Sequence, residues 1–233
     1  MKIAIIVAMD KELQLLLPLL NKTDIINSDG FELHCGTIGE AEVCIMKCGI
    51  GKVNAALGTR AMIHAFNPQL VINSGVAGGT GGAAGVLDVV VATAVGYHDV
   101  WCGPGTEWGQ AAGCPLRMEC ASEIVESSIL KQNPSVKFGV VASGDIFVDS
   151  RQVVDHVLKL YPDAVGVDME SGAIAQTCYR FGIPFACLRV ISDTPGEVAD
   201  NGAQYASFWQ AAPQKTFEII KEILNEENSL IHN

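Results

Sequence analysis

Short apolar runs rich in β-branched residues alternate along this chain with segments of helical periodicity, and this alternation constrains the fold most strongly. Strands separated by helices favour a largely parallel sheet, because a crossover helix returns the chain to the same end of the sheet. Two runs are joined only by Gly39-Glu40-Ala41, which is too short for a crossover and predicts a hairpin. The predicted strands cover residues 2–8, 31–38, 42–48, 70–73, 87–95, 136–142, 164–168 and 185–191.

Helical periodicity occupies four segments, residues 10–21, 53–66, 171–184 and 211–228. Pro18 is expected to bend or shorten the first helix, and Gly182 and Pro184 are stop signals for the third. No linker, repeat or low-complexity tract interrupts the chain, so we expect one α/β domain over residues 1–233, with a mixed, largely parallel sheet flanked by helices. The side chains expected to share helix faces are Leu13, Leu16, Leu17, Leu20, Ala56, Arg60, Ile63, Phe66, Ile174, Cys178, Phe181, Phe217, Ile220 and Leu224.

The net charge, the N-terminal segment and the cysteine spacing limit which ligands and which cellular location we expect. The formal net charge of −11 argues against binding to a nucleic-acid backbone, although it leaves a single nucleoside or nucleotide possible. The opening "MKIAIIVAMDKE" is interpreted as a first strand and not as a secretory signal. Residues 61–87 lack charge, but polar residues and Gly interrupt them too often for a membrane span. The eight cysteines form no CxxC pair, so we expect reduced thiols and a cytoplasmic protein.

Two glycine-rich segments resemble nucleotide-binding motifs but fail in detail. "GIGKVNA" (49–55) has Val53 where a phosphate-binding loop needs Ser or Thr. "GGTGGAAG" (78–85) is followed by a predicted strand, whereas a dinucleotide-binding motif opens a helix. The glycines after "LVIN" either let the backbone approach a ligand closely or only form a turn, and their local sequence supports both interpretations.

Acidic residues follow the predicted strands at several points. Glu12, Asp145, Glu170 and Asp193 lie at or just past such strand ends, where ligands bind in α/β sheets. Each has an ordinary explanation when taken singly, such as an acid at a helix N-terminus or an Asx turn. Asp168 precedes Glu170 by two residues, so both side chains leave an extended chain on one face.

Taken together, these acids predict a pocket for a small polar ligand that has one flat apolar part. Met9, Phe147 and Met169 lie beside the acids in the sequence and supply apolar surface. Carboxyl groups in such a pocket can differ in pKa, so that one is a proton donor and another a base. This combination can cleave a glycosidic bond through a cationic sugar transition state.

Six segments resemble, in order, those of bacterial 5'-methylthioadenosine/S-adenosylhomocysteine nucleosidases, which belong to the nucleoside phosphorylase superfamily. They are "MKIAIIVAMDKE", "CGIGKVNAALG", "INSGVAGG", "VVASGDIFV", "VDMESGAIAQTC" and "RVISDTPG". The resemblance runs from Met1 into the last predicted helix. It implies a nucleoside phosphorylase-like fold and hydrolysis that releases adenine and a 5-thio-substituted ribose. It also implies no metal or cofactor, and a homodimer.

The resemblance assigns roles to residues at matching positions. Asp193 matches the acid that protonates N7 of adenine, Glu12 the carboxylate that activates water, and Arg189 the cation that helps to place it. Glu170 matches the acid that binds the ribose hydroxyls, and Met169 lies beside the ribose. The further substrate-binding positions are Phe147, which stacks on adenine; Val148, which bonds the base through its main chain; Tyr205, an expected aromatic lid; and Met9, Val76, Ala77, Gly78, Asp168 and Ser192.

The chain departs from the family pattern at several positions. Val76 replaces a Ser that supports the ribose side, and Asp168 replaces a Glu. Pro104 and Ala112 replace an aromatic residue and a Pro in the segment 98–115. Residues near 101–115 of that segment are expected to reach across a dimer and complete the neighbouring pocket at the 5' substituent.

Three other functions remain open. A phosphate-dependent nucleoside phosphorylase would need cations near the first loop, where Glu12 would repel phosphate although Lys11 is present. A nucleosidase for another 5'-modified adenosine, such as 6-amino-6-deoxyfutalosine, would use the same acids. A non-catalytic nucleoside-binding protein would need the pocket alone. His98, Asp99 and Cys102 have no further ligand at sensible spacing, so we expect no metal site.

Overall fold

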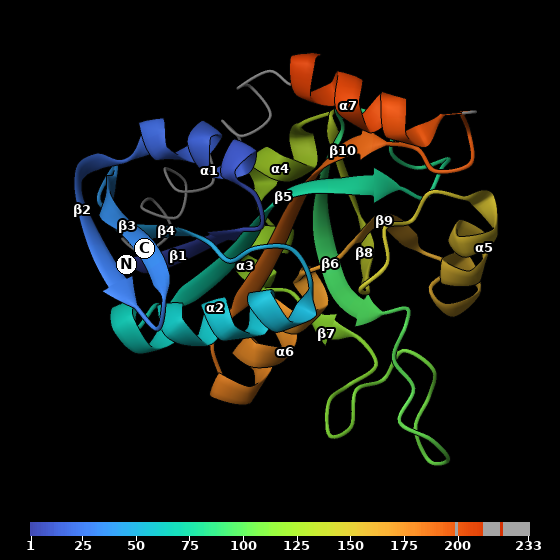
Figure 1. The fold of residues 1–233 in the computed structure, drawn as a ribbon, viewed down its shortest axis with the longest axis horizontal. Coiled ribbons are helices and arrows are strands. Elements are labelled where there is room, and N and C mark those ends of the chain that lie inside the picture. Colours follow the sequence, from blue (N-terminus) through green and yellow to red (C-terminus); the bar gives the residue numbers. More distant parts are fainter. Residues whose placement is uncertain (199, 212–219, 221–233) are drawn as a thin grey trace.

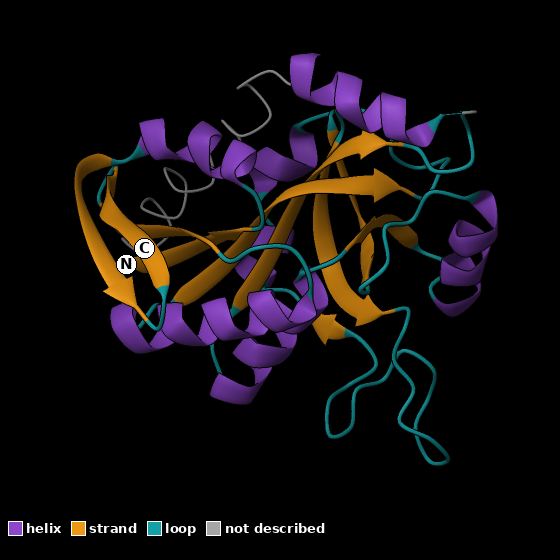
Figure 2. Ribbon diagram, viewed as in Figure 1, coloured by secondary structure: helices purple, strands orange, loops and turns teal. Residues whose placement is uncertain are grey.

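The computed structural model describes residues 1–198, 200–211 and 220. Ten strands form one mixed sheet with helices on both faces (Figures 1 and 2), α1 and α7 on one side and α2 and α6 on the other. The strands are β1 (Lys2–Val7), β2 (Asn21–Ser28), β3 (Phe31–Ile38), β4 (Ala41–Lys47), β5 (Leu70–Gly79), β6 (Val89–Tyr97), β7 (Met118–Glu119), β8 (Val136–Ser143), β9 (Ala164–Asp168) and β10 (Phe185–Asp193). The helices are α1 (Asp10–Leu16), α2 (Lys52–Phe66), α3 (Ser122–Val125), α4 (Ser128–Gln132), α5 (Arg151–Leu160), α6 (Ser171–Phe181) and α7 (Asn201–Ala211).

The sheet runs in the order β10-β6-β8-β9-β5-β1-β4-β3-β2, and β7 pairs with β6. The predicted hairpin is confirmed, because β3 and β4 pair antiparallel. Among the described parts of β1, β5, β6, β8, β9 and β10, four of the six pairings are parallel, as expected for strands joined by helices. β5 also pairs with both β10 and β9, so that β5, β10, β6, β8 and β9 close into a ring.

Two strands and one strand end differ from the sequence-based prediction. β2 was not expected, because this edge strand is exposed along most of its length and shows no apolar alternation. β7 has only two residues. β5 continues to Gly79, six residues beyond the predicted end at residue 73, because its Gly-rich second half pairs with β10. The glycines after "LVIN" are therefore partly strand and not simply a turn.

Most helix predictions hold, with local corrections. α1 ends at Leu16 and a short 3₁₀ turn containing Pro18 follows it, which confirms the predicted shortening. Gly182 ends α6 in the left-handed conformation. Arg60 and Phe181 are exposed, so the residues predicted to share a helix face with them are not buried as a set. The predicted helix over residues 211–228 lies almost entirely outside the described residues, and the one-domain prediction over residues 1–233 therefore stays a prediction.

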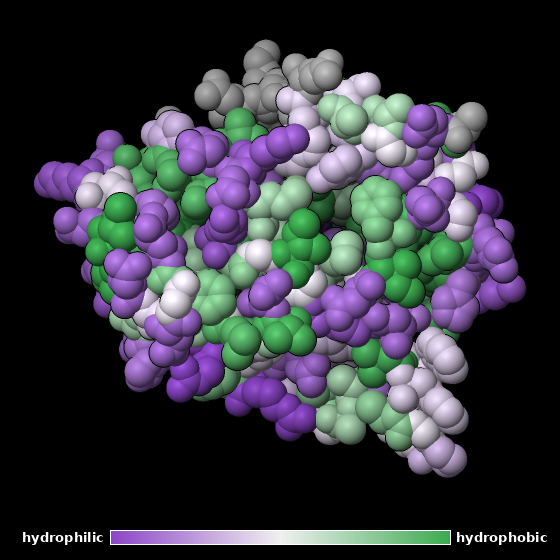
Figure 3. Space-filling view, in the orientation of Figure 1, coloured by the Kyte–Doolittle hydropathy of each residue, from purple (hydrophilic) through white to green (hydrophobic). Residues whose placement is uncertain are grey.

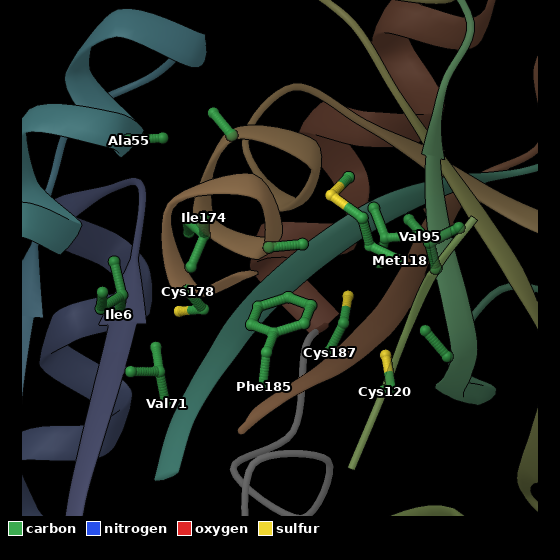
Figure 4. Packing of buried hydrophobic residues seen from close by; sticks show 14 of the residues in the cluster. Ile6, Ala55, Val71, Val95, Met118, Cys120, Ile174, Cys178, Phe185 and Cys187 are labelled. Atoms are coloured by element: carbon green, nitrogen blue, oxygen red, sulfur yellow. The ribbon is translucent and has the colours of Figure 1, made fainter. Parts of the chain in front are cut away.

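The core lies between the sheet and the helices (Figure 4). Ile6, Val71 and Phe185 project from neighbouring strands towards Ile174 and Cys178 of α6, and all are buried. Strands of this kind are covered on both faces, which explains their continuous apolar sequences. None of the helices in the described part of the chain has the length and apolar character to cross a membrane.

The prediction that every cysteine is a reduced thiol is wrong for two residues. Cys35 and Cys44 face each other across the β3–β4 hairpin and form a disulfide. The sequence did not reveal this pair, because it depends on the register of the hairpin. The other six cysteines are free, and all except Cys102 are buried.

Candidate active site

One cavity opens at the carboxyl ends of β1, β5, β8, β9 and β10, where α/β proteins bind ligands. The site residues predicted from the sequence line it, except Arg189 and the acid Asp145. Four lining residues were missed. Ala8, Ile146 and Val167 each adjoin a strand end or a predicted site residue, whereas Ile50 lies in the loop between β4 and α2. The lining residues are Ala8, Met9, Glu12, Ile50, Val76, Ala77, Gly78, Ile146, Phe147, Val148, Val167, Asp168, Met169, Glu170, Ser192, Asp193 and Tyr205.

Glu12 is held by three backbone amides from two parts of the chain. Its Oε2 accepts hydrogen bonds from the N–H groups of Ala8 and Met9, at 2.9 and 2.8 Å. Its Oε1 accepts one from Val76 N–H at 3.0 Å. Burial raises the pKa of Glu12, and these bonds together with the Arg189 charge oppose that rise without cancelling it. The carboxylate is thus oriented by the fold and is more basic than an exposed Glu.

Gly75 provides the room that this arrangement needs. A Cβ atom at this position would lie 2.4 Å from Glu12 Oε1 and 2.6 Å from Arg189 Nη1, and the backbone has φ +145°. We expect Gly75→Ala to lower kcat/KM about tenfold by displacing Glu12, since small misplacements of catalytic groups are costly. Steady-state kinetics would measure this. Gly30→Ala, in an open turn with nothing within 4 Å of the added Cβ, is the matched control. Unchanged kinetics of Gly75→Ala would contradict this account of Glu12.

Arg189 lies behind the cavity wall and is almost fully buried. It forms an ion pair with Asp168 and a hydrogen bond with Asn73 Oδ1, and its Nη2 lies 3.7 Å from Glu170 Oε2. Burial by itself would lower the pKa of Arg189, but the surrounding acids, Asp168 foremost, raise it, so the guanidinium stays charged. Asp168 also accepts hydrogen bonds from Ser171. Its carboxylate is therefore occupied by protein groups, although Asp168 lines the cavity.

Glu170 is the second acid of the cavity wall. Its Oε1 accepts a hydrogen bond from Gly51 N–H at 3.0 Å. Burial raises the pKa of Glu170 to about 7, with the charges of Asp168 and Glu12 adding to the rise and that of Arg189 opposing it. Glu170 therefore changes its charge near neutral pH.

Asp193 is the third acid, at the end of β10. Ser192 Oγ lies 2.5 Å from Asp193 Oδ1 and 3.2 Å from the Ala77 carbonyl oxygen. Burial raises the pKa of Asp193, and its hydrogen bond with Ser192 only partly offsets this. A carboxyl group that keeps its proton to higher pH is suited to donate that proton to a bound ligand.

Aromatic and thioether side chains form the apolar wall of the cavity. The Phe147 ring is half exposed and meets the Tyr205 ring edge-on, with the centroids 5.9 Å apart. Tyr205 Oη lies 3.4 Å from Met9 Sδ, which links α7 to the start of α1. This wall offers a flat aromatic ligand a ring to pack against.

His98 and Asp99 lie next to the site but do not form a metal centre. His98 is buried, and burial lowers its pKa. In the described part of the chain, no group of three or more His, Cys, Asp or Glu side chains is arranged to hold a metal ion. Asp99 and Asp145 instead bond to Lys52, a contact that the sequence analysis missed.

Comparison with known proteins shows the family to which the chain belongs. Residues 2–225 match the model of the phosphorylase superfamily. The chain is 36% identical over 230 residues to a 5'-methylthioadenosine/S-adenosylhomocysteine nucleosidase from Desulfotalea psychrophila, covering 96% of this chain and 98% of that one. These findings confirm the resemblance drawn from the six sequence segments.

Solved structures agree in fold. A 5'-methylthioadenosine/S-adenosylhomocysteine nucleosidase from Neisseria meningitidis, in complex with methylthio-immucillin-A, superposes with a TM-score of 0.90 at 32% identity, covering 97% of this chain and 99% of that one. A futalosine hydrolase mutant from Helicobacter pylori superposes with a TM-score of 0.88 at 30% identity, covering 97% of this chain and 99% of that one. The chain therefore belongs to the phosphorylase superfamily.

Proposed function

We propose that this protein hydrolyses the N-glycosidic bond of 5'-methylthioadenosine and S-adenosylhomocysteine, releasing adenine and the 5-thio-substituted ribose. The main support is that Glu12, Glu170 and Asp193, remote in the sequence, line one cavity beside an aromatic wall. The relatives named above as nucleosidases of these two compounds add independent support. Together they favour a nucleosidase over a protein that only binds nucleosides.

In the proposed reaction, one acid activates the leaving adenine and another activates the attacking water. Asp193 donates its proton to N7 of adenine, and the electron pair of the glycosidic bond leaves with the base. Glu12 takes a proton from the water molecule that attacks C1' of the ribose. A positioned general acid and a positioned general base each accelerate a reaction by a factor of about 10²–10⁴. The positive charge that develops on the ribose is stabilised by the nearby anions of Glu170 and Glu12.

The other cavity residues would bind the substrate. Glu170 would accept hydrogen bonds from the ribose hydroxyls, and Phe147 would stack on adenine while the Val148 main chain bonds the base. Arg189 would hold the carboxylates of Asp168 and Glu170 in place from behind the cavity wall. From this position it would act through these carboxylates and not by direct contact with the attacking water. The remaining proposed substrate contacts are Met9, Val76, Ala77, Gly78, Asp168, Met169, Ser192 and Tyr205.

The pKa of Glu170 predicts a pH profile. As the pH falls below about 7, Glu170 takes up a proton and loses the charge that stabilises the ribosyl cation, so kcat/KM should fall. The same shift should lower the free energy of unfolding as the pH rises through about 7, since the native state holds a proton that the unfolded chain releases near 4.5. Steady-state kinetics and urea denaturation across this pH range measure the two effects. Glu170→Gln should remove both the fall of kcat/KM at low pH and the pH dependence of the free energy of unfolding. An unchanged acid limb of kcat/KM in this variant would contradict the assignment of that limb to Glu170.

Liquid chromatography of adenine released from 5'-methylthioadenosine tests the proposed function. We expect equal release with and without phosphate, because Glu12 stands where a phosphorylase would bind that anion. Strict dependence on phosphate would indicate a phosphorylase, and binding without any turnover would indicate a non-catalytic nucleoside-binding protein.

A nucleosidase for another 5'-modified adenosine is the second candidate. It is favoured by the structural similarity to a futalosine hydrolase, which is nearly as close as that to the nucleosidase from Neisseria meningitidis. Parallel assays with 5'-methylthioadenosine, S-adenosylhomocysteine and 6-amino-6-deoxyfutalosine would separate the two candidates by their kcat/KM values.

We also propose a homodimer in which residues near 101–115 complete the neighbouring pocket. The segment between β6 and β7 extends away from the sheet (Figure 1), and it carries Trp101 and Trp108, which are stacked on each other and about half exposed. Apolar side chains also reach the surface in the middle of the face in Figure 3, and Val53 and Leu57 of α2 are exposed. We also propose a cytoplasmic location, which the six free thiols support and the Cys35–Cys44 disulfide does not.

A further inference from the structure

Three charged residues that do not line the cavity join the loops that carry its ligand-facing groups. Lys52 begins α2, Asp99 follows β6 and Asp145 follows β8. Lys52 Nζ lies 3.0 and 2.9 Å from the two carboxylate oxygens of Asp99, and 3.9 Å from Asp145 Oδ2. We call these three residues the Lys52 cluster.

Backbone hydrogen bonds close the Lys52 cluster. Lys52 N–H donates to Asp145 Oδ1 at 2.8 Å, which places a carboxylate at the N-terminus of α2, where the helix dipole favours it. Asp145 N–H donates to Asp99 Oδ2 at 2.8 Å. The Lys52 and Asp99 side chains are only 24% and 15% exposed, so this pair is shielded more than a surface ion pair such as Lys2–Glu42. Three loop ends are thereby tied at one point.

Two of the tied loops, those of Lys52 and Asp145, lead directly to groups in the cavity. Gly51, next to Lys52, donates its N–H to Glu170 Oε1 at 3.0 Å. Gly51 has φ +92°, and a Cβ there would lie 3.1 Å from Asp145 Oδ1, so the two loops are closely packed. Asp145 is followed at once by Ile146, Phe147 and Val148, which line the cavity. The Lys52 cluster thus contacts the supports of both the ribose acid and the base-stacking ring.

We infer that Lys52, Asp99 and Asp145 are positioning residues, which hold the Gly51 amide against Glu170 and hold the Phe147 loop at the cavity. This inference rests on the proposed function for its catalytic consequence, but the positioning itself does not depend on it. None of the three needs to touch the substrate. Lys52 acts through its neighbour Gly51, and Asp145 acts through the residues that follow it.

Lys52→Met tests the inference, because Met is an unbranched side chain only one atom shorter than Lys and keeps the backbone N–H, but it lacks the charge. We expect kcat/KM for 5'-methylthioadenosine to fall about 10- to 100-fold, since loops that misplace reacting groups by an ångström cost this much. Lys52→Arg, whose guanidinium can bond both oxygens of Asp99, should restore most of the activity. Lys2→Met is the matched control. Lys52 pairs with Asp99 and lies over the Tyr97 ring, and Lys2 likewise pairs with Glu42 and lies over the Phe66 ring, but at the opposite end of the sheet.

Two readouts distinguish positioning from a general loss of stability. Amide hydrogen exchange should increase in peptides covering residues 48–54 and 143–149 of Lys52→Met, and should stay unchanged in β1. The acid limb of the kcat/KM profile should move to higher pH, because Glu170 loses the Gly51 bond that favours its anion. The other groups facing Glu170 are unaltered by the substitution: Arg189 on β10, Asp168 on β9, Glu12 on α1 and Cys48 after β4.

The outcomes separate this inference from the proposed function. Wild-type protein that releases no adenine would end the proposed function, whereas the exchange experiment would still test the Lys52 cluster. Unchanged exchange in both peptides of Lys52→Met would overturn the inference, as would wild-type kcat/KM and pH profile in an active enzyme. An equal loss in Lys2→Met would also overturn it, since that would show a general effect of removing a lysine.

Discussion

Asp193→Asn is expected to lower kcat for 5'-methylthioadenosine by about two orders of magnitude or more, while nucleoside binding survives. An Asn side chain has nearly the shape of Asp and can still accept a hydrogen bond from Ser192, but it has no proton to donate to N7. Adenine would then have to leave as an anion. The pKa of Asp193 is raised by burial, so the wild-type group is protonated over a wider pH range than an exposed Asp. Single-turnover kinetics and calorimetric titration with a nucleoside analogue would measure the two effects separately.

Asp155→Asn is the control for this substitution, because Asp155 forms an exposed ion pair with Arg151 on α5 outside the cavity. We expect its kinetics to stay close to those of the wild type. An Asp193→Asn variant with wild-type kcat would exclude Asp193 as the general acid. Loss of binding together with turnover would instead assign Asp193 to substrate binding.

Glu12→Gln is expected to lower kcat by about 10³. The substitution removes the base that takes a proton from water. It also disturbs the local structure, because three N–H groups point at the carboxylate and the Gln amide group can offer them only one oxygen. The remaining N–H groups would face the Gln NH₂ group, which cannot accept a hydrogen bond. Adenine release measured by chromatography gives kcat, and circular dichroism shows whether the variant is folded.

Glu42→Gln is the matched control, since Glu42 pairs with Lys2 at the exposed start of β4. We expect no change in its kcat. If folded Glu12→Gln retained more than about a tenth of the wild-type kcat, Glu12 would not be the general base.

Local sequence patterns predicted much of the fold. The alternation of apolar runs and helical segments identified β1, β3, β4, β6, β8, β9 and β10, and the three-residue connection identified the β3–β4 hairpin. The ring closed by β9 and β5 was not predictable, because only Gly78 and Gly79 of β5 pair with β9 and no local pattern marks them. β2 was missed because its stability comes from pairing with β3 and not from burial.

The candidate site was predictable to a similar extent. Acids that follow strand ends converge for a geometric reason, since the ends of neighbouring parallel strands meet at one edge of the sheet. The sequence predicted that Arg189 helps to place the attacking water, but in the structure Arg189 lies behind the cavity wall. Its position depends on Asn73 and Asp168, which lie on other strands and could not be foreseen from the local sequence. The Lys52 cluster was invisible in the sequence, because its members are 47 and 93 residues apart from Lys52 and meet only in the folded chain.

A crystal structure of the protein with a non-hydrolysable C-nucleoside analogue of 5'-methylthioadenosine tests the central claim most directly. We predict one bound nucleoside in the cavity, with Asp193 within hydrogen-bonding distance of N7, Glu170 on the ribose hydroxyls and Glu12 facing C1' across a water molecule. A nucleoside bound elsewhere, or one that touches only a single member of this group of acids, would contradict the account.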